Sequence, residues 1–175
     1  MNRVLVVDHA KCTGCRSCEM ACSVAHGGAV NPHKSAVRVV KWEGEGLSVP
    51  VVCLQCDEPA CAAICPVRAI VPDPATGALI VDGDLCVGCR MCVVACPFGA
   101  IALDGDRRRA VKCDLCGGAE PWCVRFCEPG ALAYELPIMA SLRKKRGAGR
   151  RLLEVLNVLR AGGVASGRGC LLYTS

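Results

Sequence analysis

Aromatic side chains are scarce in this 175-residue sequence, which has two Trp, two Tyr and two Phe. Large aromatic side chains supply much of the buried apolar area in most cores, so packing alone would hold this chain together weakly. No stretch approaches the roughly 18 uninterrupted apolar residues that a membrane span needs, and we expect no span. A glycine repeat is also missing and 53% of the residues are hydrophobic, which excludes collagen-like and disordered chains.

Cysteine, in contrast, is abundant: 17 residues, or nearly one in ten. This leaves disulfides or metal as the source of stability. Disulfides need an oxidising compartment, and residues 1–12 lack the apolar segment and the cleavage site of a secretory signal. The cysteines also lie in tight groups, which suit convergence on a shared ion or cluster. We therefore expect a reduced, metal-loaded protein in the cytoplasm.

The last six residues, CLLYTS, are interpreted separately. Residues 170–175 are what TGT CTC TTA TAC ACA TCT encodes, a string that resembles the mosaic end of a sequencing-library transposon. We interpret them as a sequencing-adapter artefact and exclude Cys170 from the chemistry. The alternative is an ordinary frayed tail with one free thiol.

The remaining sixteen cysteines form four groups of four. Group one is Cys12, Cys15, Cys18 and Cys22; group two is Cys53, Cys56, Cys61 and Cys65; group three is Cys86, Cys89, Cys92 and Cys96; group four is Cys113, Cys116, Cys123 and Cys127. Groups one and three are internal repeats, VDHAKCTGCRSCEMAC against VDGDLCVGCRMCVVAC, with nine identities in sixteen positions. Groups two and four share a looser pattern. The chain is therefore interpreted as two copies of a two-group unit.

The pattern between the cysteines predicts an α+β fold of short elements. We expect strands over residues 3–8, 37–42, 47–52, 78–82, 100–104 and 131–136, the second and third forming a hairpin, and short helices over 16–25, 90–95 and 121–126. His9, His26 and His33 are expected in loops. Leu152, Val155, Leu156 and Leu159 have helical spacing and predict an amphipathic helix, with Gly147 and Gly149 weakening its start. The expected domains are residues 1–136, a basic helix over 137–169 and the artefact over 170–175.

The spacing Cys-x2-Cys-x2-Cys-x3-Cys is typical of 4Fe–4S clusters. Three thiolates hold one cluster and the fourth ligates the other cluster of a pair. Pro66 and Pro97 follow the last cysteine of groups two and three, as in bacterial ferredoxins, and Gly14 and Gly88 avoid a side chain beside a sulfide. We predict four 4Fe–4S clusters. A zinc-ordered interaction module is the alternative, and it would be colourless where iron–sulfur protein is brown.

Charge is unevenly distributed along the chain. Residues 1–142 hold 13 Lys and Arg against 15 Asp and Glu, whereas residues 143–175 hold eight basic residues and one acidic residue. Each cluster with its four thiolates carries roughly −2, so the cysteine-bearing part becomes strongly negative. The basic segment contains no interleaved aromatic, and we expect no nucleic-acid binding. It is either a solvated helix face or a dock for an acidic partner surface.

Residues 3–136, through all sixteen cysteines, resemble the four-cluster polyferredoxin subunits of oxidoreductase complexes. The segments CSVAHGGAVNPHKSAVRVVKWEGEG and CRMCVVACPFGAI, with the basic terminal helix, look most like the small iron–sulfur subunit of tungsten aldehyde oxidoreductases. The resemblance implies two pseudo-symmetric ferredoxin-like units and a crossed set of ligands. The implied sets are Cys12, Cys15, Cys18 and Cys127; Cys22, Cys113, Cys116 and Cys123; Cys53, Cys56, Cys61 and Cys96; and Cys65, Cys86, Cys89 and Cys92. Ser23 and Glu128 stand where the simplest pattern has Pro, and both belong to one implied pair.

This resemblance implies a non-catalytic subunit that relays single electrons between a catalytic subunit, with a tungsten or molybdenum cofactor, and a second redox partner. Aldehyde oxidoreductase is the favoured partner; hydrogenase, formate dehydrogenase and carbon monoxide dehydrogenase are alternatives. The terminal helix is expected to dock onto the catalytic subunit or a second copy of the chain. A cluster-based redox sensor is a further alternative, but it predicts one labile cluster. No nucleotide loop, activated nucleophile or paired carboxylates are present.

Overall fold

The computed structural model describes residues 3–161, so the expected artefact over 170–175 and residues 162–169 of the expected basic helix lie outside the described residues. The chain divides into two compact units, the first ending at Pro137 and the second beginning at Ile138 within helix α5 (Pro137–Ala161). The first unit carries all sixteen grouped cysteines, and the second contains the rest of α5.

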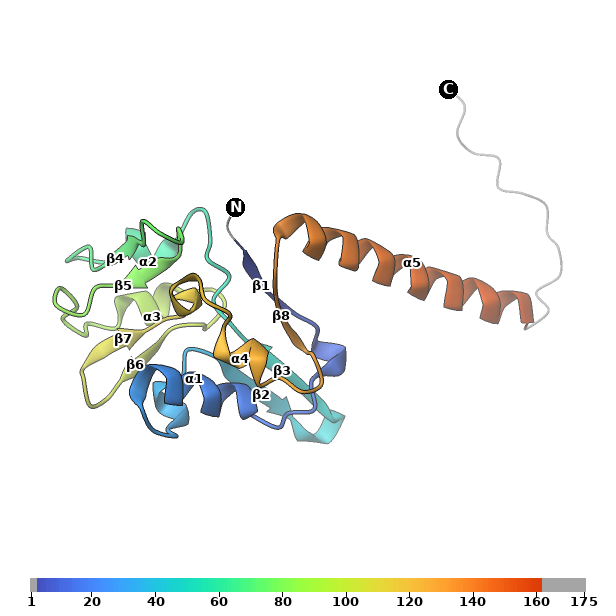
Figure 1. Cartoon of the computed structure of the whole chain (residues 1–175), viewed down its shortest axis with the longest axis horizontal. Coiled ribbons are helices and arrows are strands. Elements are labelled where there is room, and N and C mark those ends of the chain that lie inside the picture. Colours follow the sequence, from blue (N-terminus) through green and yellow to red (C-terminus); the bar gives the residue numbers. More distant parts are fainter. Residues whose placement is uncertain (1–2, 162–175) are drawn as a thin grey trace, which may run out of the picture. The chain divides into compact units, whose positions relative to one another are not determined.

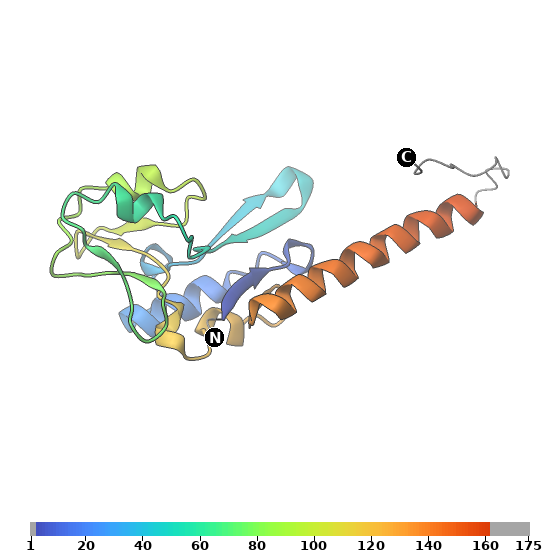
Figure 2. The same ribbon diagram turned by 90° about the horizontal axis from the view of Figure 1, so that it is seen from above.

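The first unit is built from four separate antiparallel pairs of short strands (Figure 1). The outermost pair joins the two ends of the unit: β1 (Val4–Val7) pairs with β8 (Leu132–Glu135), with Val4 opposite Glu135. The hairpin of β2 (Arg38–Trp42) and β3 (Leu47–Val51) extends away from its neighbours (Figure 2). Strand β4 (Ile70–Pro72) pairs with β5 (Leu79–Val81), and β6 (Ala102–Asp104) pairs with β7 (Arg109–Val111).

Four short helices follow or carry the cysteines. They are α1 (Ser17–Gly27), α2 (Ala60–Ala63), α3 (Met91–Ala95) and α4 (Trp122–Arg125), and short 3-10 turns cover His9–Lys11, Pro32–Lys34, Glu43–Glu45 and Leu115–Gly118. Helix α1 packs against α4, and α2 packs against α3. The long-range partners are therefore group one with group four and group two with group three.

The unit consists of two halves, one inserted within the other. The inner half runs over residues 53–112, and the outer half is assembled from residues 3–52 and 113–136. Each half has its own core. The outer core gathers Cys18, Cys22, Val37, Val39, Val52, Cys123 and Leu132, and the inner core gathers Cys61, Ile70, Cys92 and Ile101. This arrangement gives the two ferredoxin-like units with short strands and helices that the sequence predicts.

Both cores are made of cysteine and small aliphatic side chains. None of the aromatic side chains in residues 3–161 is fully buried; Trp42, Trp122, Phe98 and Phe126 are each 40% exposed or more. Six cysteines are instead buried: Cys18, Cys22, Cys53, Cys61, Cys92 and Cys123. The scarcity of aromatic residues thus appears in the fold as cores whose centres are sulfur atoms, and each core is small for its chain length.

Glycine is required between the first two cysteines of groups one and three, but the close contacts involve protein atoms. Gly14 and Gly88 have φ of +71° and +68°, in the left-handed region. A Cβ at Gly88 would lie 2.0 Å from the backbone oxygen of Arg108, and one at Gly14 would lie 2.5 Å from Oγ of Ser48. These positions therefore demand glycine independently of any sulfide.

Helix α5 is longer than the leucine spacing indicates. It begins at Pro137, a favourable first position for proline, and continues without interruption through Gly147 and Gly149. Gly147 and Gly149, expected at the weak start of the leucine-spaced segment, lie inside α5, whose first residue is also that of the basic helix expected over 137–169. Leu152, Val155 and Leu159 are each more than 50% exposed, so the helix carries an apolar stripe beside its basic residues.

Candidate metal centres

Three pockets in the first unit are each lined by four cysteines, and each set draws on two groups. One pocket is lined by Cys53, Cys56, Cys61 and Cys96. A second is lined by Cys65, Cys86, Cys89 and Cys92, and a third by Cys22, Cys113, Cys116 and Cys123. In every case three cysteines come from one group and the fourth comes from another.

The four remaining cysteines also lie near one another. Cys12 and Cys127 both pack against the outer core that contains Cys18. Burial raises the pKa of the Cys18 thiol to about 12, and the charges of Cys127 and Cys15 add to this increase. Cys127, the last cysteine of group four, is thus close to the loop of group one.

Burial and mutual repulsion oppose ionisation of several inward-facing thiols. At Cys22 burial acts in the same direction, but hydrogen bonds from His26 and the N–H of Ala36 outweigh it and lower the pKa. Burial raises the pKa of Cys113 to about 12, and it also raises the pKa values of Cys61, Cys92 and Cys123. In each case the charges of other cysteines add to the rise. Thiolates so placed need a cation among them, and iron or zinc would supply it. All-sulfur donor sets in small apolar pockets therefore fit a 4Fe–4S cluster.

Helix α1 explains why Ser23 replaces proline after Cys22. The helix continues past Cys22 to Gly27, whereas α3 ends at Ala95 and Cys96 is followed by Pro97. A proline at position 23 would interrupt α1. Instead the fully buried Ser23 Oγ donates to the backbone oxygen of Met20 at 2.8 Å and accepts from the N–H of Asn31 at 3.1 Å.

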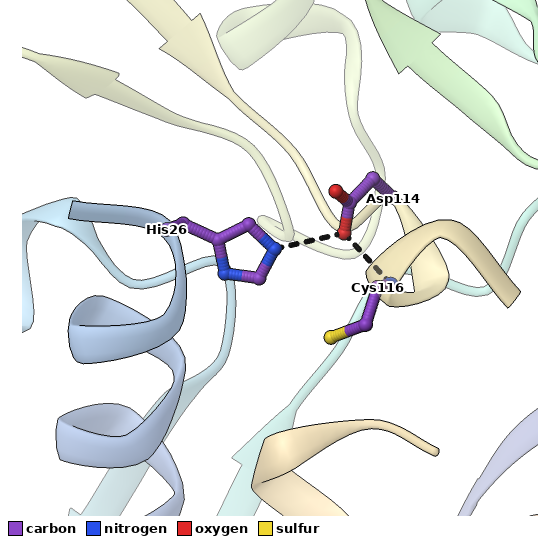
Figure 3. Close-up of side chains that lie close together, drawn as sticks. All are labelled: His26, Asp114 and Cys116. Atoms are coloured by element: carbon purple, nitrogen blue, oxygen red, sulfur yellow. Dashed lines mark hydrogen bonds and ion pairs between the residues drawn. The ribbon is translucent and has the colours of Figure 1, made fainter. Parts of the chain in front are cut away.

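The added turn of α1 places His26 beside the group-four ligands (Figure 3). His26 Nδ1 lies 2.9 Å from the backbone oxygen of Cys22 and 3.8 Å from its Sγ, while Nε2 lies 3.1 Å from Oδ1 of Asp114. The same Asp114 oxygen accepts the N–H of Cys116 at 2.9 Å. The carboxylate of Asp114 raises the pKa of His26, as do the neighbouring Cys116 and Cys22. One hydrogen-bonded chain therefore connects two cysteines of one pocket.

The histidine expectation is correct in part only. His9 and His33 lie in short 3-10 turns, but His26 lies within α1, where the helix was expected to end near Ala25. Sequence reasoning also gave no role to Gln55 or Lys112, which lie close to the cysteine loops. The signal that could have identified His26 is its spacing, since it follows Cys22 by four residues and therefore shares a face of a continuing helix.

The fold and its cysteine sets define a ferredoxin-type iron–sulfur protein. Residues 45–136 match the 4Fe–4S dicluster domain and residues 9–25 match a 4Fe–4S binding domain. The chain belongs to the 4Fe–4S dicluster family of electron-transfer subunits, and it carries 4Fe–4S clusters, with sixteen cysteines for four of them. The alternative of a zinc-ordered interaction module does not fit a member of this family.

Named relatives place the chain among non-catalytic subunits of oxidoreductase complexes. It is 41% identical to YsaA of Escherichia coli, a candidate electron transport protein, over 75% of this chain and 88% of the relative. It is 39% identical to the polyferredoxin-like subunit of aliphatic sulfonate oxidoreductase of Pyrococcus furiosus, over 70% of each chain. It is 35% identical to subunit 2 of formate hydrogenlyase of Escherichia coli, over 75% of this chain and 81% of the relative.

The helices of residues 3–161 include none that combines the length and the apolar character of a bilayer crossing.

Proposed function

We propose that this chain relays single electrons between a catalytic oxidoreductase subunit and a second redox partner, with the sixteen cysteines holding four clusters in crossed sets. The observation that carries the proposal is the lining of three pockets by cysteines from two groups each. Each 4Fe–4S cluster supplies a site that can gain or lose one electron.

The proposed ligand sets are those that the resemblance implies. They are Cys12, Cys15, Cys18 and Cys127; Cys22, Cys113, Cys116 and Cys123; Cys53, Cys56, Cys61 and Cys96; and Cys65, Cys86, Cys89 and Cys92. The contacts of α1 with α4 and of α2 with α3 support this crossing, because each helix pair joins the two groups that exchange a cysteine.

The proximity of a ligand set in the inner half to one in the outer half also supports a relay. The charge of Cys53 adds to the raised pKa of Cys113, as does that of Cys22. Cys113 therefore lies near cysteines of two sets, one from the outer half and one from the inner half. Gln55 reinforces this junction, since its Nε2 donates to the backbone oxygen of Cys113 at 2.8 Å. The two halves are joined where electrons would need to pass between them.

For the catalytic partner, we infer an aldehyde oxidoreductase with a tungsten or molybdenum cofactor. The likeness of two sequence segments to the small subunit of such enzymes supports this choice. The relative from aliphatic sulfonate oxidoreductase, at 39% identity, supports an oxidoreductase partner of some kind. A hydrogenase or formate dehydrogenase partner is the second candidate, and the relative from formate hydrogenlyase favours it. A cytoplasmic location accords with cysteines that must stay reduced to bind iron.

A reduction experiment with defined partners tests the function. Anaerobically prepared holoprotein is mixed with each purified catalytic subunit and its substrate: an aldehyde, formate or hydrogen. We expect rapid bleaching of the brown absorbance with the aldehyde-dependent subunit. Bleaching with formate or hydrogen alone would reassign the partner. Absence of iron, or clusters that no partner reduces, would contradict the relay itself.

The basic helix α5 supports docking onto an acidic surface. It contains Arg143, Lys144, Lys145, Arg146, Arg150, Arg151 and Arg160 against one acidic residue, Glu154. We propose that α5 attaches this subunit to the catalytic subunit, and association with a second copy is the alternative. Charge attraction of this kind weakens as salt increases.

A further inference from the structure

Lys112 is a buried amine that has only uncharged partners. Its residue is 9% exposed, although Lys is rarely buried without a counter-charge. Its Nζ donates to the backbone oxygen of Leu79 at 2.5 Å, to Oε1 of Gln55 at 3.0 Å and to the backbone oxygen of Cys113 at 3.5 Å. The ion pairs found within residues 3–161 do not include Lys112.

Neutral acceptors satisfy the hydrogen bonds of an ammonium but not its charge. Moving a charged group from water into the protein interior is unfavourable, and an opposite charge nearby is needed to offset this cost. No carboxylate pairs with Lys112 in the described part of the chain. Asp104 and Asp114 line a pocket together with Lys112, but neither forms an ion pair with its Nζ within the described residues. A direct counter-charge must therefore come from another kind of group.

The cysteine sets on either side are the candidates for this charge. Lys112 lines the pocket of Cys53, Cys56, Cys61 and Cys96, and it directly precedes Cys113 of the neighbouring set. Its positive charge also opposes the rise in the pKa of Cys61 that burial causes. A 4Fe–4S cluster with four thiolates carries roughly −2 and would supply the missing negative charge.

Gln55 fixes the position of this amine. It lies between Cys53 and Cys56 with φ of +50°, and its Oε1 accepts both the Lys112 ammonium and the N–H of Leu79 at 2.9 Å. Its Nε2 donates to the backbone oxygen of Cys113. The amine is therefore held at the junction between the inner and outer halves by residues from both.

We propose that Lys112 is the internal counter-charge of the cluster held by Cys53, Cys56, Cys61 and Cys96, and that it raises the reduction potential of that cluster. The inference rests on the proposed ligand sets. A reduced cluster carries one more negative charge than an oxidised one, so a fixed positive charge beside it favours reduction. Lys112 places a positive charge beside the cluster and is not one of its ligands.

The test compares Lys112→Met with Lys112→Arg in the anaerobically purified full chain, with Lys34→Met as the matched control. Lys34 is also partly buried but pairs with Asp106 at 2.7 Å. Redox titration followed by electron paramagnetic resonance measures each potential, and iron is counted per chain. We expect Lys112→Met to lower the reduction potential of one cluster by at least about 59 mV. For a one-electron step this is a tenfold decrease in the ratio of reduced to oxidised cluster. Lys112→Arg and Lys34→Met should leave it within a few-fold of the parent value.

Unchanged potentials in Lys112→Met, with iron intact, would overturn the inference and leave the relay function standing. Equal shifts in Lys112→Met and Lys112→Arg would also overturn it, because only packing would then matter. If Lys112→Met loses clusters, Lys112→Gln, which keeps two donors, replaces it. Loss of clusters in both uncharged variants but not in Lys112→Arg supports the counter-charge role, whereas loss in all three contradicts it. Absence of clusters in the parent chain would instead contradict the proposed function.

Discussion

In the proposed crossed sets, Cys22 belongs to a cluster whose other cysteines lie about 90 to 100 positions further along the chain. We expect Cys22→Ser to damage the cluster of Cys113, Cys116 and Cys123 and to spare the cluster of the Cys12 loop. The side-chain replacement itself should cost the fold little, apart from the folding free energy that a lost cluster no longer supplies. Cys22 is 7% exposed and its Sγ accepts the N–H of Ala36 at 3.4 Å, a bond that a serine oxygen can also accept. The expected loss of stability from this bond is therefore about 1 kcal/mol or less.

The loss of iron is the more direct readout of the change. If the serine fails to hold its iron, one cluster of four is lost and the iron content falls by about a quarter. The assay is iron per chain together with electron paramagnetic resonance of the dithionite-reduced protein. The spectrum of Cys22→Ser should match that of Cys116→Ser, and Cys12→Ser is the matched control in the same group as Cys22. A Cys22→Ser spectrum that matches Cys12→Ser would mean that each group binds its own cluster, and the crossed sets would be wrong.

Three further predictions concern stability and assembly. Anaerobic chelation of iron should unfold residues 3–136, because metal binding supplies folding free energy to sulfur-centred cores; a sharp thermal transition and near-UV dichroism retained in the apoprotein would refute this. Gly88→Ala should destabilise the holoprotein by about 1–2 kcal/mol or more, given its φ of +68° and the Arg108 oxygen, whereas Gly105→Ala, which meets nothing within 4 Å, should be near neutral in thermal unfolding. Truncation after Leu136 should preserve iron per chain but weaken binding to the catalytic subunit and reduce its salt dependence; a truncated chain that loses iron and binds normally per intact molecule would show that α5 only stabilises the core.

The sequence predicted the elements that repeat or alternate strongly. The β2–β3 hairpin lies within one residue of its expected bounds at each end, and the strands of the β1–β8 pair were both expected. Strand β4 and strand β7 were missed. Strands β5 and β6 are equally short and were expected, but β4 includes Pro72 and β7 begins in the charged run of residues 107–109, so neither shows the apolar pattern of a strand.

The sequence likewise predicted one part of the candidate site and missed another. The cysteine spacing alone identified the chemistry of the ligands, because four thiolates at such short separations favour a cubane cluster. The surroundings of the ligands could not be predicted from the sequence. The contacts of Lys112 with Gln55 and Leu79 join residues that are far apart in the chain and form only in the fold. The position of His26 depended on whether α1 continued past Cys22. The local indications were the absence of proline at position 23 and the spacing of four residues between Cys22 and His26.

The insertion of one half within the other has a consequence for biosynthesis. All eight cysteines of the inner half lie between residues 53 and 96, so this half is complete while the ribosome is still adding the end of the chain. The outer half cannot close until Cys127 and β8 have emerged and β8 has paired with β1. We therefore expect iron to enter the inner half first. Chains stalled before residue 113 would carry two clusters and leave Cys12, Cys15, Cys18 and Cys22 open to oxidation.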